Sequence, residues 1–143
     1  MSETIKVVIR FKGREELEDV EKDDWEIFPD NKTVQAPCYE GSKSKPADLK
    51  FSFDRILDHD TTQEQMYKMA GAETVKQFCS GYNGTIFAYG MSGTGKTFSM
   101  LGPEEVVEVI KTGGEISEEI QSLYGIIPRA IRDIFTFINT AIE

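Results

Sequence analysis

Alternating hydrophobic and polar positions dominate the first part of the chain and predict β-strands. Residues 5–10 place Ile5, Val7 and Ile9 on one face, and Val8 adds an apolar side chain to the other, so this strand is expected in the core. Further predictions are a short hairpin from 25–28 and 33–36 around a turn at 29–32, a strand over 49–53 with Ile56 and Leu57 close behind, and loops over 15–24 and 37–47. The beginning of the chain is therefore expected to be rich in strands.

The three- and four-residue spacing of a helix follows from residue 61 onward. Thr61 and Glu64 have the spacing of a capping box, in which the hydroxyl and the carboxylate each satisfy a backbone N–H. Gly71 lies within this predicted helix, and Gly81 is a good terminator. The expected apolar stripe consists of Met66, Tyr67, Ala70, Val75, Phe78 and Cys79.

A second amphipathic helix is predicted at the end of the sequence. Pro128 suits its first turn, where a missing N–H costs no hydrogen bond. Apolar residues recur at helical spacing at Ile131, Ile134, Phe135, Ile138 and Ile142. This stripe is expected to pack on the sheet as core rather than to serve as a docking surface.

Between the two helices lies a pattern with chemical meaning. Residues 85–89 are β-branched, aromatic and apolar, as in a buried strand, and residues 90–97 fit the phosphate-binding pattern G-x-x-x-x-G-K-[ST]. Glycines let successive N–H groups reach phosphate oxygens, Lys96 supplies charge for the outer phosphates, and Thr97 offers a hydroxyl to Mg²⁺. The alternative is a surface turn that is rich in Gly, Ser and Thr. The predicted phosphate site comprises Gly90, Met91, Ser92, Gly93, Thr94, Gly95, Lys96 and Thr97.

The helix that begins at Thr97 is predicted to stop at Gly102 and Pro103, which remove helical preference and a backbone donor. An acidic insert follows over 104–122. Its apolar run 106–110 and its Gly113-Gly114 pair fit a hairpin arm, a short helix or a loop equally well.

Composition narrows the class of protein. A chain of 143 residues with 39% hydrophobic residues suits one globular domain. The net charge of −9 argues against unaided binding to nucleic acid or to an anionic membrane. Two cysteines form neither a disulfide framework nor a metal cluster, and no signal peptide or membrane-spanning run occurs. A soluble cytosolic protein is expected.

The phosphate loop alone leaves ATPases, GTPases and small-molecule kinases open. The residues around it are more specific, because 80–90, running into the loop, resemble the signature of the kinesin motor domain. Residues 53–57 followed by 62–67, the opening strand, and 125–129 are similar to kinesin segments in the same order. The resemblance covers essentially the whole chain.

This resemblance implies an α/β P-loop NTPase fold, with part of a kinesin-type central mixed sheet flanked by helices and a small N-terminal antiparallel hairpin lobe. It also implies an ATP-driven motor on microtubules, with ATP or ADP and Mg²⁺ as cofactors and a cytoplasmic, cytoskeletal location. The insert corresponds to a variable loop of the family, and a tolerant insertion is favoured over a regulatory arm.

The resemblance also carries over residues expected beside the base. Kinesins have Arg-x-Arg-Pro at the end of the first strand, where this chain has Arg10, Lys12 and Gly13, so base binding is expected to be looser. Phe98 replaces a frequent histidine and retains a π-face for stacking. Without the family position, an ordinary surface charge at Arg10 and a core aromatic at Phe98 would explain both residues. Met91 and Ser92 depart mildly from the usual Gln-Thr.

The two switch motifs of kinesins, Asn-x-x-Ser-Ser-Arg and Asp-x-x-Gly-x-Glu, do not occur after Thr97. Because hydrolysis needs groups that position water and stabilise charge, no catalytic residue is assigned. Residues 1–143 are therefore expected to be the N-terminal part of a single, incomplete motor domain. Its microtubule-facing elements are expected to be absent, and its sheet would be completed by more of the same protein or by a second chain.

Two functions stay open. The chain is the ATP-binding portion of a microtubule motor ATPase, or it is a nucleotide-binding module without hydrolysis or motility. A phosphate-loop kinase acting on a small acceptor is a distant third.

Overall fold

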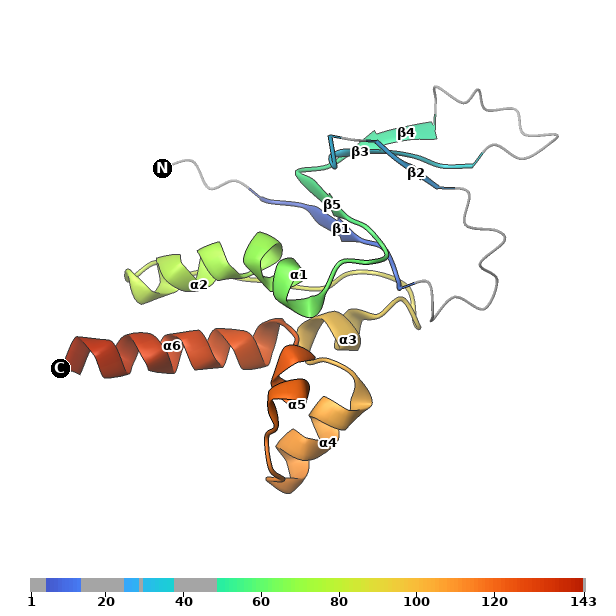
Figure 1. The fold of residues 1–143 in the computed structure, drawn as a ribbon. Helices are drawn as coiled ribbons and strands as arrows, with labels where there is room; N and C mark the ends of the chain where they lie inside the picture. Colours follow the sequence, from blue (N-terminus) through green and yellow to red (C-terminus); the bar gives the residue numbers. More distant parts are fainter. Residues whose placement is uncertain (1–4, 14–24, 29, 38–48, 143) are drawn as a thin grey trace. The chain divides into compact units, whose positions relative to one another are not determined.

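The computed structural model describes residues 5–13, 25–28, 30–37 and 49–142. The chain forms two compact units, residues 1–61 and residues 62–143, which we call the N-terminal and the C-terminal unit. Their elements are labelled in Figure 1. Both parallel and antiparallel strands occur, together with helices, as predicted for an α/β protein.

The N-terminal unit contains two small sheets. In one, β1 (Val8–Arg10) and β5 (Arg55–Leu57) pair in parallel, with Ile9 opposite Ile56. In the other, β2 (Glu26–Ile27), β3 (Thr33–Gln35) and β4 (Lys50–Ser52) pair antiparallel in that order. Val34, Ile56 and Leu57 are buried and form the core of this unit.

The hairpin between β2 and β3 is confirmed. The Asp30 carboxylate accepts hydrogen bonds from the amides of Lys32 and Thr33, both at 2.9 Å. These backbone donors lower the pKa of Asp30, with that of Lys32 as the largest cause. Asn31 has a φ of 50°, the left-handed conformation that Asn tolerates in tight turns. The predicted loops fall largely on residues 14–24 and 38–48, outside the described part of the chain.

The first strand is shorter than predicted. Ile5 is 86% exposed and Val7 is 42% exposed, so the predicted core strand over 5–10 is wrong at its beginning. The Val7 amide donates to the Asp54 carboxylate at 2.7 Å, and the Val7 carbonyl accepts from the Asp54 amide at 3.1 Å. At Val7 a carboxylate therefore takes the place of a backbone acceptor, and within the described residues this sheet consists of two strands only.

The C-terminal unit is helical. Its elements are α1 (Gln63–Ala70), α2 (Ala72–Cys79), α3 (Lys96–Met100), α4 (Glu104–Thr112), α5 (Glu118–Ser122) and α6 (Ile126–Ile142). The long α6 packs against α1, α2 and α3. Met66, Tyr67, Val75, Val106, Tyr124 and Ile126 are buried. Among the described residues, no helix has the length and apolar character that crossing a bilayer requires.

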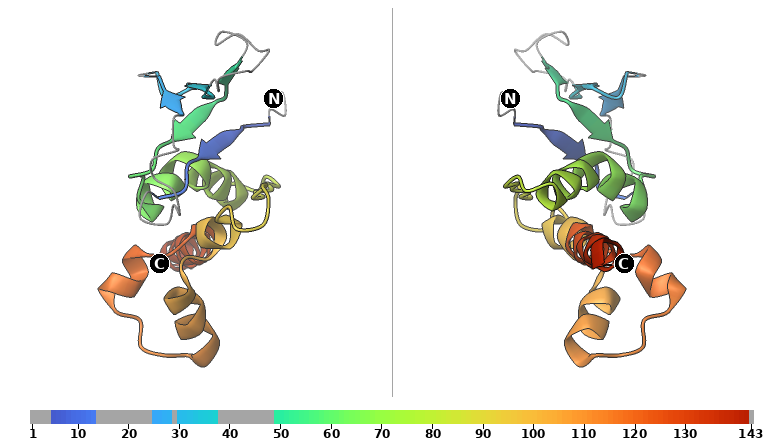
Figure 2. Two further views of the ribbon diagram at one scale, coloured as in Figure 1. Left: turned by 90° about the vertical axis from the view of Figure 1, so that its right-hand side faces the viewer. Right: turned by 90° about the vertical axis from the view of Figure 1, so that its left-hand side faces the viewer.

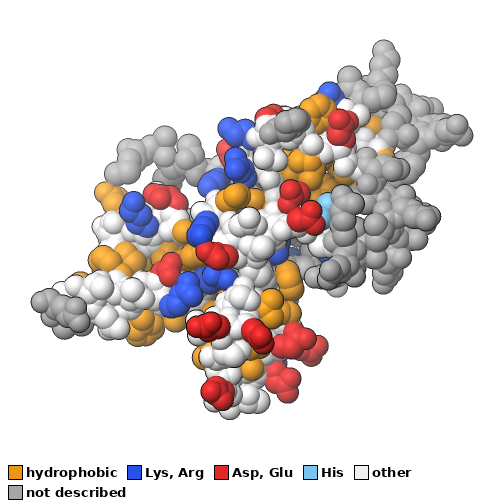
Figure 3. Space-filling view, viewed as in Figure 1, with side chains coloured by type: hydrophobic (Ala, Val, Ile, Leu, Met, Phe, Trp, Pro, Cys, Tyr) orange, Lys and Arg blue, Asp and Glu red, His pale blue; other side chains and the backbone are white. Residues whose placement is uncertain are grey.

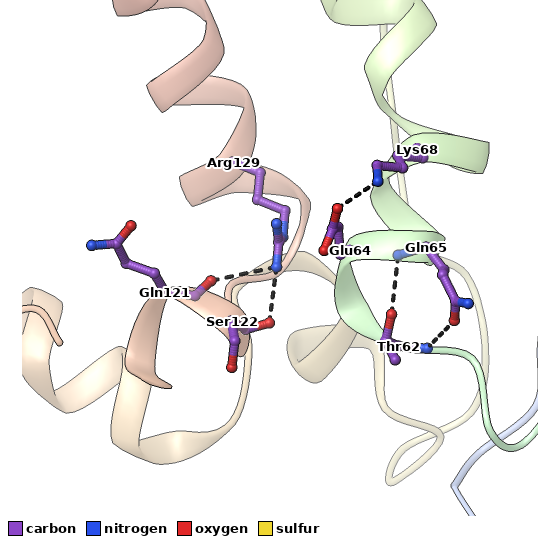
Figure 4. Close-up of polar contacts among 7 residues, drawn as sticks. All are labelled: Thr62, Glu64, Gln65, Lys68, Gln121, Ser122 and Arg129. Atoms are coloured by element: carbon purple, nitrogen blue, oxygen red, sulfur yellow. Dashed lines mark hydrogen bonds and ion pairs between the residues drawn. The ribbon is translucent and has the colours of Figure 1, made fainter. Parts of the chain in front are cut away.

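The capping box of α1 lies one residue later than predicted. Thr62, not Thr61, is the N-cap: its hydroxyl accepts from the Gln65 amide at 3.2 Å, and the Gln65 side chain accepts from the Thr62 amide at 2.9 Å (Figure 4). The Thr61 hydroxyl instead donates to the Asp58 carboxylate at 2.8 Å. Glu64 pairs with Lys68 across one turn, which lowers the pKa of Glu64.

The predicted helix after residue 61 is two helices, with the break at Gly71. A Cβ there would lie 3.0 Å from the Tyr67 ring and 3.3 Å from Ile126, so glycine allows the break to lie close to α6. Part of the predicted stripe is buried, but Phe78 is 52% exposed.

The predicted stripe of α6 is not core. Ile131 is 51%, Phe135 60% and Ile138 42% exposed, and Ile134 is half-buried; the Ile142 side chain lies outside the described residues. Within the C-terminal unit only helices pack on α6, and they bury its beginning, at Ile126, rather than this stripe. The helical spacing identified which side chains of α6 are apolar, but it could not show whether other elements pack on them.

The insert is helical, which decides among the three open possibilities. Figure 2 shows α4 and α5 projecting from the rest of the C-terminal unit as one arm. The arm leaves and returns at one point, where the Gly125 amide donates to the Leu101 carbonyl at 3.0 Å and Val106 is fully buried. Acidic side chains gather on it (Figure 3), and the exposed ones are Glu104, Glu105, Glu108, Glu115, Glu118 and Glu119.

A buried arginine holds the arm to α6. Arg129 is 4% exposed and donates to the carbonyls of Tyr124 and Ser122 at 2.8 Å, and to that of Gln121 at 3.4 Å. Figure 4 shows its guanidinium group directed at the end of α5, where the helix dipole favours a cation. Burial lowers the pKa of Arg129, but the guanidinium stays charged at any ordinary pH.

Candidate nucleotide-binding site

The phosphate loop (residues 90–97) has the backbone that its glycines allow. Gly93 and Gly95 have φ values of 80° and 85°, in the left-handed region that side chains with a Cβ rarely adopt. A Cβ at either position would meet nothing within 4 Å. These glycines are therefore needed for backbone conformation, and the space beside them is open to a ligand.

Lys96 is held across the loop at the start of α3. Its ammonium group donates to the carbonyls of Gly90 at 3.0 Å and Met91 at 2.6 Å. The Thr94 hydroxyl also donates to Met91, at 2.8 Å. An ammonium group has three donors, so the two bonds that close the loop leave one N–H for a phosphate oxygen.

Thr97 is the second residue of α3 and is exposed. A hydroxyl is a hard oxygen ligand of the kind that Mg²⁺ takes, usually together with waters and phosphate oxygens. The predicted position of a metal ligand is thus accessible. Met91 and Ser92 are exposed as well, in line with a loop that acts through its backbone.

The segment before the loop is not the buried strand that was predicted. Residues 82–90 form no strand, and Phe87 is 76% and Tyr89 95% exposed. A strand needs a neighbour for its backbone groups, and none of the described strands pairs with this segment. Composition predicted a strand from these residue types, but composition alone does not supply that neighbour.

The helix after the loop is anchored by residues that the pattern did not single out as functional. Gln63 at the start of α1 is 5% exposed, and its side-chain amide donates to the Phe98 carbonyl at 2.7 Å. The Gly125 amide binds the next turn at Leu101. Gln63 lies in the segment 62–67 that resembles kinesins, and that resemblance was its only sequence signal.

Three predicted base contacts lie in the N-terminal unit, at the end of β1. Arg10 donates to the Thr61 carbonyl at 3.5 Å, and the ring nitrogen Nδ1 of His59 lies 2.5 Å from the Lys12 carbonyl. A Cβ at Gly13 would be 3.8 Å from the nearest atom, so no close packing requires glycine there. Because the phosphate loop belongs to the other unit, a role of Arg10, Lys12 and Gly13 in base binding stays a prediction. The same holds for stacking by Phe98, which is half-buried.

The residues present fit a nucleotide with Mg²⁺. Left-handed glycines open the loop, a lysine crosses it, and an accessible threonine follows at the start of a helix. Bound nucleotide would supply a γ-phosphoryl group for transfer to water, and Mg²⁺ would neutralise charge on it. This chain's own part would be to bind and orient the phosphates.

Comparisons with known proteins agree with the resemblance seen in the sequence. A model of the kinesin motor domain family matches residues 9–143. Kinesin-related protein 3 of Dictyostelium discoideum is 37% identical over 142 residues, which are 98% of this chain and 10% of that protein. Kinesin-like protein KIF15-B of Xenopus laevis is 42% identical over 96 residues, which are 67% of this chain and 6% of that protein.

A solved structure of a fast kinesin superposes with a TM-score of 0.63 at 30% identity and covers 93% of this chain and 32% of that chain. The chain thus spans a tenth or less of the two relatives and about a third of the solved one. Since the family match covers nearly all of its residues and the fold agrees, this chain belongs to the kinesin motor domain family.

Proposed function

We propose that this chain is the ATP-binding portion of a kinesin-like microtubule motor, in which the full domain couples ATP hydrolysis to movement along microtubules. The observation that carries this proposal is the loop with left-handed Gly93 and Gly95 that ends in Lys96 and Thr97 at the start of α3. Family membership supports the rest. Residues 1–143 then form one incomplete domain, with a cytoplasmic location on the cytoskeleton.

In this proposal the loop binds ATP or ADP. Backbone N–H groups of residues 90–97 and the Lys96 ammonium group bind the phosphates, and Thr97 coordinates Mg²⁺. Arg10, Lys12, Gly13 and Phe98 contact the base. No residue of this chain is assigned to proton transfer or to positioning of the attacking water, because no switch motif occurs after Thr97.

Microtubules are the proposed partner, through parts of the motor outside these residues. A second proposed partner is a further strand, from more of the same protein or from a second chain, that completes the sheet. Ile5, Val7, Phe87 and Tyr89 support it, since all four are exposed apolar side chains. A monomer that unfolds cooperatively in calorimetry and sediments as one species would count against a second chain.

Titration with fluorescent ADP and Mg²⁺ tests the nucleotide site. Lys96→Ala removes a charged donor to phosphate, so affinity should fall about 10- to 100-fold. Lys111→Ala makes the same charge change on the exposed surface of α4 and should leave affinity unchanged. Equal affinity of wild type and Lys96→Ala would refute the proposed site.

Phosphate release with and without microtubules separates the motor reading from the alternative of a nucleotide-binding module. We expect no turnover above background from residues 1–143 alone, because the groups that position water are not among them. Stimulated release would show that these residues suffice for hydrolysis. Phosphoryl transfer to a small acceptor would instead favour the third hypothesis, a phosphate-loop kinase.

A further inference from the structure

The short helix that carries the phosphate-binding side chains cannot hold its own position. α3 has five residues, fewer than an isolated helix needs, and it presents Lys96 and Thr97 in its first turn. The last carbonyls of a helix have few amide partners within it, so groups from other elements commonly bond them. Whatever bonds them also sets where Lys96 and Thr97 lie.

Gln63 bonds one of these carbonyls. Its amide nitrogen lies 2.7 Å from the Phe98 oxygen, and the residue is 5% exposed. Only two polar or charged residues are buried to this degree among the described residues, and the other, Arg129, binds the insert. The buried Gln63 amide thus forms a hydrogen bond between α1 and α3, at a carbonyl two residues after Lys96.

The backbone of Gln63 is itself held in place by the capping box of α1. Gln63 is the first residue of α1, directly after the N-cap Thr62, whose reciprocal bonds with Gln65 hold the first turn (Figure 4). Gln63 therefore projects from a turn of α1 that is held by a capping box. Asparagine would be one methylene too short to span the same distance, and methionine would have similar length without a donor.

We propose that Gln63 is a positioning residue of the nucleotide site: through the Phe98 carbonyl it holds α3 so that Lys96 and Thr97 face the phosphates and the metal. The inference rests on the proposed function, because it names what orients that same site. Gln63 acts through the backbone and touches no ligand itself.

The test compares fluorescent ADP affinity, with Mg²⁺, in folded full-length variants of this chain. Gln63→Met should bind about tenfold more weakly, as losses of outer-shell partners commonly do. Gln63→Asn keeps an amide but shortens its reach, so it should also bind more weakly, and it provides a second variant if Gln63→Met does not fold. Gln77→Met makes the same chemical change on the exposed face of α2 and should bind like wild type.

A generic loss of stability is separated by Val75→Ala, which removes buried methyl groups from α2 and leaves the bond between Gln63 and Phe98 intact. It should lower the unfolding midpoint while leaving affinity near that of wild type. Hydrogen exchange supplies an independent readout: the amides of Ser99 and Leu101, bonded at 2.9 and 2.8 Å within α3, should exchange faster in Gln63→Met and not in Val75→Ala.

If both Gln63 variants bind ADP like wild type while Lys96→Ala does not, the positioning role is wrong and the nucleotide site stands. A loss in Val75→Ala as large as in Gln63→Met would also overturn the positioning role. If Lys96→Ala binds like wild type, the proposed function fails, and the role of Gln63 fails with it.

Discussion

The two segments that flank the phosphate loop differ in how they are held. Before the loop, residues 82–89 have no strand partner among the described residues, and Phe87 and Tyr89 are exposed. After the loop, the backbone of α3 and its C-cap accept hydrogen bonds from Gln63 and Gly125. Both flanks were predicted as regular structure from their apolar residues. The difference lies in where their partners are. Those of α3 come from α1 and from Gly125, directly before α6, in the same unit. The described strands include no partner for 82–89.

The loop is therefore supported from its C-terminal side. A helix forms its own hydrogen bonds and needs only a few contacts at its ends, but a strand needs a neighbour for every second backbone group. This comparison predicts large effects for changes around α3 and small ones for changes in 82–89.

The largest effect is expected at Gly125, where the backbone passes close to the end of α3. A Cβ at Gly125 would lie 2.6 Å from the carbonyl carbon of Met100 and 2.7 Å from the Leu101 amide nitrogen. Backbone cannot yield as a side chain can, so Gly125→Ala should cost about 3 kcal/mol of unfolding free energy in urea titrations.

Gly114→Ala is the matched control, because its nearest neighbour would be 3.5 Å away, an ordinary contact. It should change stability by less than about 0.5 kcal/mol. Equal stability of the two variants would show that the backbones at Gly125 and Met100 are not closely packed. Gly125 would then not hold the end of α3 in place.

The next effect concerns Arg129, which binds the returning end of the insert. Arg129→Met retains the apolar stem but leaves the carbonyls of Tyr124 and Ser122 without their charged donor. The loss should be about 2 kcal/mol in the same measurement. Arg132→Met, at a half-exposed arginine 3.7 Å from Asp133, should lose less than about 0.5 kcal/mol. A similar loss in both would mean that charge, not capping of α5, is what matters.

A smaller effect is expected where α1 meets α6. The Tyr67 hydroxyl donates to the Asp133 carboxylate at 2.6 Å, and Tyr67→Phe removes that bond at a cost of about 1 kcal/mol. Burial, and then this bond to Asp133, raises the pKa of Tyr67 above its ordinary value of 10.0. The folded state thus keeps its proton where the unfolded state loses it.

The pH dependence follows from that sign. The contribution of Tyr67 is complete below pH 10, the unfolded pKa, and is lost progressively above it. The stability difference between wild type and Tyr67→Phe should therefore shrink above pH 10 and stay constant from pH 7 to 9. Tyr82→Phe, at a tyrosine that is 53% exposed, should not show the loss of about 1 kcal/mol. A difference that grows above pH 10 would contradict the assignment.

Local signals in the sequence predicted local structure well. The hairpin at Asp30, the end of α3 just before Gly102 and the glycine-rich turn at 93–95 each depend on a few neighbouring residues, and each was predicted. The capping box was predicted one residue early because Thr61 and Thr62 both have an acceptor three residues later. The prediction of burial was wrong where burial depends on residues far away in the sequence, as in the stripe of α6 and in 85–89. Gln63 was not singled out as functional, because a lone glutamine shows its role only when Phe98 lies beside it.

The smallest effect is expected in the segment before the loop. Phe87 is 76% exposed, so Phe87→Ser should change the unfolding free energy of this chain by less than about 0.5 kcal/mol, since no apolar contact of consequence is lost. Tyr89→Ser, at a side chain that is 95% exposed, should behave alike. Measuring both at several protein concentrations sharpens the comparison, because a loss that grows with concentration would mean that a second copy covers the segment. A loss above 1 kcal/mol at every concentration would instead mean that 82–89 is packed within the chain and that the loop is supported from both sides.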